Sequence, residues 1–172
     1  MTNNILPGNH GGSRPTLRWA VLDESLPPGI HTPKLDGDVG WDLEAMEDVT
    51  IFPGKALDIP INVRLHLPKG VWAEIRGRSS IARRGLQVDA GTIDTGYRGP
   101  LYVLARNTKV WQPGDPTSDE FRNENAVRIK AGERVGQVVF YNILHMGYTH
   151  VAKDDFDSDT ERGENGFGST GK

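Results

Sequence analysis

The sequence contains no cysteine, so disulfide bonds, thiol catalysis and a zinc site with cysteine ligands, as in a cytidine deaminase, are all excluded. No apolar run approaches the length of a membrane span, and the first residues contain no signal-like apolar segment. The five histidines are not spaced as metal ligands usually are. In the absence of a membrane span or signal segment, we expect the protein to be cytoplasmic and to have no membrane partner.

An excess of basic charge is also missing. The 20 lysines and arginines are outnumbered by 23 aspartates and glutamates, which gives a formal net charge of −3. Non-specific binding of nucleic acid needs a basic field, so no nucleic-acid partner is expected, whereas a single nucleotide needs only a local basic pocket. Apolar residues make up only 36% of the chain, and 21 glycines and 11 prolines are many for 172 residues. This composition indicates one loop-rich all-β domain with a modest core that subunit contacts supplement.

Alternation of apolar and polar residues is clearest over residues 56–67. Pro60 within this run predicts an edge position or a bulge. The apolar positions of the run are Leu57, Ile59, Ile61, Val63, Leu65 and Leu67. Shorter strand patterns cover 16–22, 71–76, 101–106, 126–129, 134–141 and 144–150, and 109–125 reads as a long surface loop. With no helix beyond about two turns expected, the pattern predicts an all-β sandwich or barrel.

The central stretch, residues 77–99, carries most of the candidate chemistry. Arg78, Ser79 and Ser80 follow the strand pattern of 71–76. Either serine could cap one short helical turn at 81–84, which Gly85 would end. Free backbone N–H groups beside a guanidinium and hydroxyls suit an anionic oxygen, so this segment is a candidate phosphate site.

Residues 91–97 read as a hairpin whose glycines allow tight backbone turns. Asp94 and Tyr97 would then lie near its tip, just downstream of the candidate phosphate site. This combination predicts a nucleotide site with a single general base. The plainer alternatives are that Asp94 only fastens its own turn and that Tyr97 only packs across strands.

Two further polar residues interrupt apolar strand patterns. Asp42 lies between Trp41 and Leu43 and should point away from both. It could pair with a neighbour or hold a hydrated Mg²⁺, which prefers one or two carboxylates together with substrate phosphates. Gln137 lies within 134–141, where a hydrogen bond in the core and a ligand contact are equally compatible with the pattern.

The two ends of the chain are too polar for the core. Residues 1–15 are expected to form a flexible N-terminal segment, 16–151 the β-barrel domain and 152–172 a mobile C-terminal arm. Arg162 and Phe167 lie among glycines in this arm. A plain linker has no need of either, so the pattern favours a lid that closes on a bound nucleotide.

Five segments, 39–45, 77–80, 91–99, 132–137 and 162–171, occur in the order found in the trimeric dUTPases, the family that this chain resembles. Segment 77–83 is closer to the related dCTP deaminases, a non-zinc family with the same fold. Those enzymes need a glutamate on the strand after the hairpin, where this chain has Leu104 and no acid within 101–106. A dUTPase is therefore preferred to a deaminase. Hydrolysis of dCTP remains an alternative, because Val88 stands where some dUTPases have asparagine. A catalytically silent nucleotide-binding regulatory module is a second alternative.

The resemblance implies a distorted jelly-roll β-barrel, a homotrimer with shared active sites, and Mg²⁺-assisted hydrolysis of dUTP to dUMP and pyrophosphate. It implies that Asp94 is the general base, that Tyr97 packs under the deoxyribose and that Asp42 acts on the metal through water. The substrate-binding residues that it implies are Arg78, Ser79, Ser80, Gly91, Thr92, Ile93, Tyr97, Tyr102, Gln137, Arg162, Phe167, Gly168 and Ser169.

Overall fold

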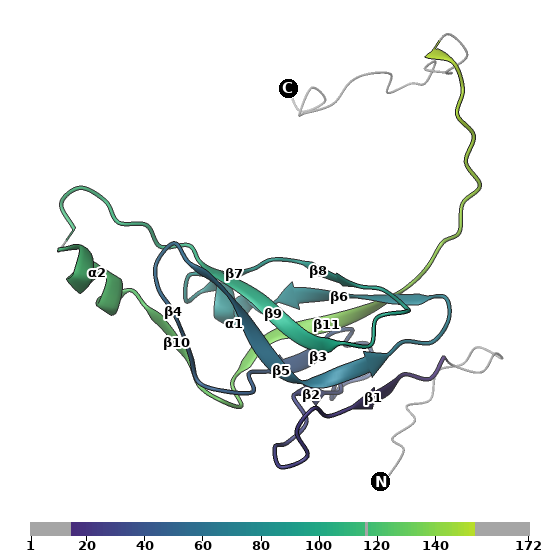
Figure 1. Ribbon diagram of the computed structural model, residues 1–172, viewed down its shortest axis with the longest axis horizontal. Coiled ribbons are helices and arrows are strands. Elements are labelled where there is room, and N and C mark those ends of the chain that lie inside the picture. The colour runs from purple at the N-terminus through teal and green to yellow at the C-terminus, as the bar shows by residue number, and fades with distance from the viewer. Residues whose placement is uncertain (1–14, 116, 154–172) are drawn as a thin grey trace.

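The computed structural model describes residues 15–115 and 117–153, which form strands and two short helices (Figure 1). The strands are β1 Arg18–Ala20, β2 Ile30–His31, β3 Trp41–Glu44, β4 Val49–Ile51, β5 Ala56–His66, β6 Val71–Gly77, β7 Leu86–Val88, β8 Gly91–Ile93, β9 Pro100–Asn107, β10 Val127–Ile129 and β11 Arg134–Asn142. The helices are α1 Ser79–Ala82 and α2 Ser118–Glu124. Neither helix, in this part of the chain, is long and apolar enough to cross a membrane.

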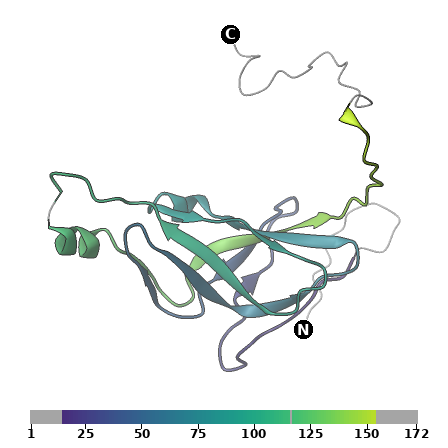
Figure 2. The same ribbon diagram turned by 45° about the horizontal axis from the view of Figure 1, so that its top comes forward.

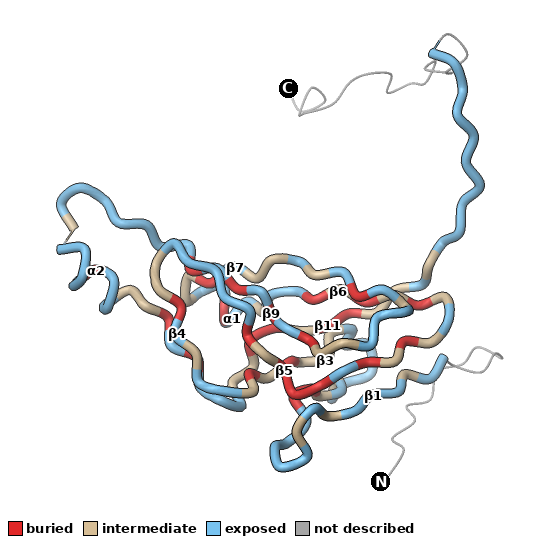
Figure 3. Tube along the Cα trace, viewed as in Figure 1, coloured by how far each residue is buried: buried red, intermediate tan, exposed pale blue. Residues whose placement is uncertain are grey.

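Two antiparallel sheets face each other across one apolar core. One has the strand order β1-β5-β9-β7, the other has the order β2-β3-β11-β6-β8, and β10 and β4 form a separate ribbon. The buried residues lie along the strands, while α2 and the chain after β11 are exposed (Figure 3). The expected all-β class is confirmed, and both sheets place alternate side chains outward.

The core follows the alternation of the sequence. On β9 Leu101, Val103 and Ala105 are buried, while Tyr102 and Leu104 between them are exposed. On β6 Val71, Ala73 and Ile75 are buried in the same way. The inward side chains of the two sheets meet as in other β-sandwiches.

The long strand β5 departs from strict alternation. Its register against β9 shifts between Ile61 and Arg64, which confirms the bulge predicted from Pro60. Because the bulge interrupts the period of two, Asn62 is buried although the pattern placed it outside. The expectation for Leu57 was also wrong: it lies near the start of the strand with 39% of its surface exposed.

Three other expectations were wrong. Residues 109–125 contain α2, which begins with a capping box in which Thr117 and Glu120 bond each other's backbone N–H groups. Residues 144–150 form no strand but run away from the sheets (Figure 2). Residues 91–97 form no hairpin, because β8 pairs with β6 in one sheet, while the next strand, β9, pairs with β5 and β7 in the other.

Candidate functional site

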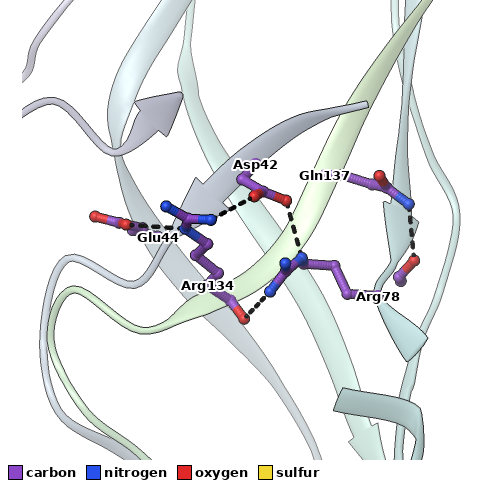
Figure 4. A network of polar contacts seen from close by, with 6 residues as sticks. Asp42, Glu44, Arg78, Arg134 and Gln137 are labelled. Atoms are coloured by element: carbon purple, nitrogen blue, oxygen red, sulfur yellow. Dashed lines mark hydrogen bonds and ion pairs between the residues drawn. The ribbon is translucent and has the colours of Figure 1, made fainter. Parts of the chain in front are cut away.

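A cluster of ion pairs lies where β3, β11 and the end of β6 meet (Figure 4). Nε of Arg78 lies 2.8 Å from Oδ1 of Asp42, and Nη1 of Arg134 lies 3.1 Å from Oδ2 of the same carboxylate. These three side chains are only partly exposed, with Asp42 at 22%. Asp42 therefore holds two guanidinium groups side by side, and the three residues carry a net positive charge that suits a polyphosphate.

Further contacts fix the position of Arg134. Its Nε lies 3.5 Å from Oε1 of Glu44, whose other oxygen lies 2.9 Å from Nε2 of His31. Its backbone carbonyl accepts a long hydrogen bond, 3.5 Å, from Nη1 of Arg78. Because Asp42 and Glu44 are two residues apart on β3, both carboxylates reach the same face of the sheet. The sequence analysis did not select Glu44 or Arg134 as site residues. The spacing of two between Asp42 and Glu44 was the signal that could have identified Glu44.

Gln137 completes this corner from the middle of β11. Its Nε2 donates to the carbonyl oxygen of Gly77, at 3.2 Å. Gly40 leaves the space for it, because a Cβ at position 40 would overlap the Gln137 carboxamide. Gln137 is thus an outward-facing residue whose Nε2 has one backbone partner and whose carboxamide oxygen lies against Gly40.

The two serines next to Arg78 lie in the first turn of α1. The residue that caps this helix is Arg78, in an extended conformation, and no side chain makes a cap hydrogen bond. The expected serine cap was therefore wrong. Gly85, with φ at +83°, follows the helix as predicted. An open groove of about 500 Å³ runs beside this turn and is lined by Arg78, Ser79 and Val88 among others.

The segment between β8 and β9 carries Asp94 and Tyr97, and both are exposed. Thr95 fastens this segment by donating its hydroxyl to the carbonyl of Val71, at 2.6 Å. The Tyr97 hydroxyl donates to the carbonyl of Pro100, at 2.9 Å, so its ring lies across Gly99. A Cβ on residue 99 would collide with that ring, so the glycine is required for this ring position.

We call the residues between β8 and β9 the Asp94 segment, and Arg78 with its ion-pair partners Asp42 and Arg134 the Arg78 cluster. The two lie at opposite ends of β6. Ile93 pairs with Ala73, whereas Arg78 follows the last residue of the strand. Five residues of extended chain separate Ala73 from Arg78, a length of about 17 Å. The structure therefore brings Asp94 and Tyr97 together, and Arg78 and Gln137 together, but does not join the two groups within one chain.

The other candidate residues are divided in the same way. Thr92 is exposed, Gly91 is half-buried and Ile93 is buried, all on β8 beside Asp94. Tyr102 is exposed on the other sheet, opposite Pro60, and so lies away from the Arg78 cluster. The expected arm residues Arg162, Phe167, Gly168 and Ser169 lie outside the described residues.

The donor set limits how a metal ion can be held. Within residues 15–115 and 117–153, no three histidine or acidic side chains converge as metal ligands. Both oxygens of Asp42 already pair with guanidinium groups. These residues do not fit a closed metal site, but Asp42 fits a hydrated Mg²⁺ that arrives with substrate phosphates and is touched through water.

Comparison with known proteins identifies relatives over most of the chain. The family model described as dUTPase matches residues 28–112 and 121–171. The deoxyuridine 5'-triphosphate nucleotidohydrolase of Cutibacterium acnes is 36% identical over 150 residues, which are 86% of this chain and 88% of that protein. The Pol polyprotein of caprine arthritis encephalitis virus is 37% identical over 139 residues, but this chain spans only 11% of its length.

Solved structures of the same family share the fold. A mutant dUTPase of Staphylococcus bacteriophage 80alpha with dUpNHpp superposes with a TM-score of 0.72 at 25% identity, covering 91% of this chain and 99% of that one. The native EIAV dUTPase superposes with a TM-score of 0.61 at 22% identity, covering 82% of this chain and 100% of that one. The jelly-roll-like β fold expected from the sequence is thereby confirmed. The chain belongs to the dUTPase family.

Proposed function

We propose that this chain, a dUTP diphosphatase by family, uses Asp94 as general base and Mg²⁺ as cofactor in sites shared between the subunits of a homotrimer. The observation that carries the proposal is the separation of two complementary groups on one sheet. The Arg78 cluster can hold a polyphosphate, and its carboxylates are paired with arginines, whereas Asp94 is a solvent-exposed carboxylate towards the other end of β6.

The Arg78 cluster supports binding of the triphosphate. Arg78 and Arg134 are paired with Asp42 and Glu44, but each guanidinium has more N–H donors than these contacts use, and phosphate oxygens can accept them. Gln137 adds a carboxamide with one backbone partner, and Ser79 lies in the first turn of α1. Hydrolysis of a phosphoanhydride bond depends mainly on positioning and charge neutralisation, which these groups provide.

Asp94 supports activation of the attacking water. Asp94 lies in a solvent-exposed loop, where its carboxylate can accept a proton from a water molecule. The water oxygen forms a bond to the α-phosphorus while its proton passes to Asp94. The bond from the α-phosphorus to the oxygen that bridges to the β-phosphorus breaks on the opposite side. Pyrophosphate leaves with that oxygen, and dUMP retains the oxygen of the water.

Tyr97 supports selection of the sugar. Its hydroxyl end is held beside Gly99 by the bond to the Pro100 carbonyl, and 44% of the residue is exposed, so the ring offers a carbon face to a ligand. A deoxyribose can pack on such a face, whereas a 2′-hydroxyl pressed against a carbon surface would lose its hydrogen bonds to water. The ring therefore disfavours a ribonucleotide.

When bound with the substrate, Mg²⁺ would supply neutralisation of the negative charge on the leaving pyrophosphate. Asp42 would hold it through water, with Arg78 and Arg134 keeping the carboxylate oriented. Because Asp94 and Arg78 lie about 17 Å apart on one chain, a single triphosphate meets both only if they come from different subunits. A closed ring of identical chains repeats one contact at every interface, so a contact between the Asp94 end of β6 in one chain and the Arg78 end in the next would form the same site at each interface.

The test is product analysis with the full-length protein and each of dUTP, dCTP and dTTP in the presence of Mg²⁺. We expect pyrophosphate and dUMP from dUTP. Asp94→Asn should lower turnover by about 10²- to 10⁴-fold while a non-hydrolysable dUTP analogue still binds. Asp36→Asn, which removes an exposed carboxylate from another loop, should leave turnover unchanged.

Three results would contradict the proposal. Ammonia released from dCTP would indicate a deaminase instead. Pyrophosphate released from dCTP in preference to dUTP would correct the substrate. Full turnover by Asp94→Asn would remove this residue from the mechanism.

A further inference from the structure

We propose that Arg76 is a further substrate-binding residue of this site, which contacts the triphosphate beside Arg78, and that Glu74 holds it when no substrate is bound. The inference rests on the proposed function, because it assigns an additional contact to the same ligand. No resemblance or motif assigns a role to Arg76.

The register of the sheet puts Arg76 in the row of the polar site residues. Asp42 of β3 pairs with Gln137 of β11, and Gln137 pairs in turn with Arg76 of β6. Directly opposite residues in antiparallel strands point to the same face, and adjacent strands lie about 4.8 Å apart. Asp42, Gln137 and Arg76 therefore form one row across the outer face of the sheet.

Arg76 also shares a face with Arg78. Residues 76 and 78 are two positions apart, and both the strand and Arg78 itself are extended, with φ −102° and ψ 145° at Arg78. Their Cα atoms are therefore about 7 Å apart. Gln137 faces both, because it pairs with Arg76 and donates to the carbonyl of Gly77 between them. A triphosphate that meets Arg78 and Gln137 thus passes within reach of the long side chain of Arg76.

The guanidinium of Arg76 pairs with Glu74. Its Nε lies 2.6 Å from Oε2 of Glu74, two residues back along β6, and 56% of the side chain is exposed. The same carboxylate oxygen accepts the Tyr141 hydroxyl at 3.2 Å, and Tyr141 stacks on Trp72 with ring centroids 4.7 Å apart. Glu74 therefore accepts hydrogen bonds from two side chains, and Arg76 is the more exposed partner of the ion pair.

Arg76 and Glu74 are both charged, and a stronger anion can replace Glu74 as the partner of Arg76. The hydrogen bond from Arg76 lowers the pKa of Glu74, and the same bond raises the pKa of Arg76, so both groups are ionised at neutral pH. An exposed pair of this kind is weak because water screens it. A triphosphate offers several negative charges and more acceptor oxygens than one carboxylate, so it can draw Arg76 away from Glu74.

The experiment is a double-mutant cycle with binding of a non-hydrolysable dUTP analogue, and separately of inorganic pyrophosphate, measured by calorimetry. Arg76→Gln should raise both dissociation constants about three- to tenfold. Arg76→Lys, which keeps the charge but not the fork of donors, should have a smaller effect. Glu74→Gln should tighten binding because it releases Arg76, and it should have no such effect in the Arg76→Gln background.

Lys130→Gln is the matched control. It removes the cation of another exposed ion pair, with Asp48 at 2.7 Å, in the turn between β10 and β11, and it should leave binding unchanged. Wild-type affinity in Arg76→Gln would overturn the proposal, as would tightening by Glu74→Gln that persists without Arg76. If the wild-type protein binds pyrophosphate through Arg76 but does not hydrolyse dUTP, the proposed function fails and the anion contact stands.

Discussion

Gly40→Ala is a sharp test of the site because it acts on Gln137 alone. A Cβ at position 40 would lie 2.8 Å from the Cδ of Gln137 and still closer to its Oε1, so the carboxamide must rotate away. The φ of Gly40 is outside the left-handed region, so alanine fits the backbone without strain. The change therefore moves one functional side chain and leaves the fold intact.

The size of the effect follows from the bonds that Gln137 gives up. Loss of its hydrogen bond to the Gly77 carbonyl costs about 0.5–1.5 kcal/mol of stability, and the melting temperature should fall by only about 1–6 °C. Loss of a hydrogen bond to a charged phosphate costs about 1.5–3 kcal/mol, which raises the dissociation constant of a non-hydrolysable dUTP analogue about tenfold or more.

Calorimetric titration and thermal unfolding measure the two effects separately. In a Gln137→Ala background the added Cβ meets no carboxamide, so Gly40→Ala should weaken binding no further. Unchanged affinity in Gly40→Ala, or an equal loss in both backgrounds, would refute the assignment of Gln137 to the phosphate site.

Three other predictions concern separate parts of the chain. Asn62→Ala should lower stability by about 3 kcal/mol and the melting temperature by about 6–12 °C. The reason is that the buried carboxamide forms hydrogen bonds with five backbone groups of the 22–27 loop. An unchanged melting temperature would contradict this prediction. The hydrogen bond from Lys130 holds the pKa of Asp48 below 3.8, so this bond stabilises the fold above that pH and is lost as the pH falls through the lowered value. The difference in unfolding free energy between wild type and Asp48→Asn should accordingly be largest at neutral pH and vanish in acid, and a difference that grows in acid would argue against it. Gly99→Ala should push the Tyr97 ring off its bond to Pro100 and lower the ratio of kcat/KM for dUTP to that for UTP, whereas an unchanged ratio would show that the ring does not select the sugar.

Alternation predicted most of the fold. The strands β6 and β9 were predicted from alternation of apolar and polar residues, which arises because each strand has one face in the core. The period could not show that β8 leaves β9 for the other sheet, since pairing depends on contacts distant in sequence. The α2 helix was missed although Thr117 and Glu120 form a capping box, because charged residues around it were read as a loop.

The sequence predicted individual residues of the candidate site but not how they are arranged in space. Asp42, Arg78 and Gln137 were chosen from three separate segments, and the structure joins them on neighbouring strands. Arg134 was missed because its role comes from the sheet register, which puts it opposite Glu44. The separation of Asp94 from Arg78 could not be read from 15 intervening residues, because their distance depends on where β8 pairs with β6.

The central claim is that a complete site combines the Asp94 segment of one subunit with the Arg78 cluster of another. The direct measurement is turnover of dUTP by oligomers reassembled from an equal mixture of Asp94→Asn and Arg78→Ala chains, each inactive alone. Random mixing in a closed ring pairs an intact Asp94 with an intact Arg78 in about a quarter of the sites. We predict recovery of about a quarter of wild-type turnover, and mixed oligomers as inactive as either parent would contradict the account.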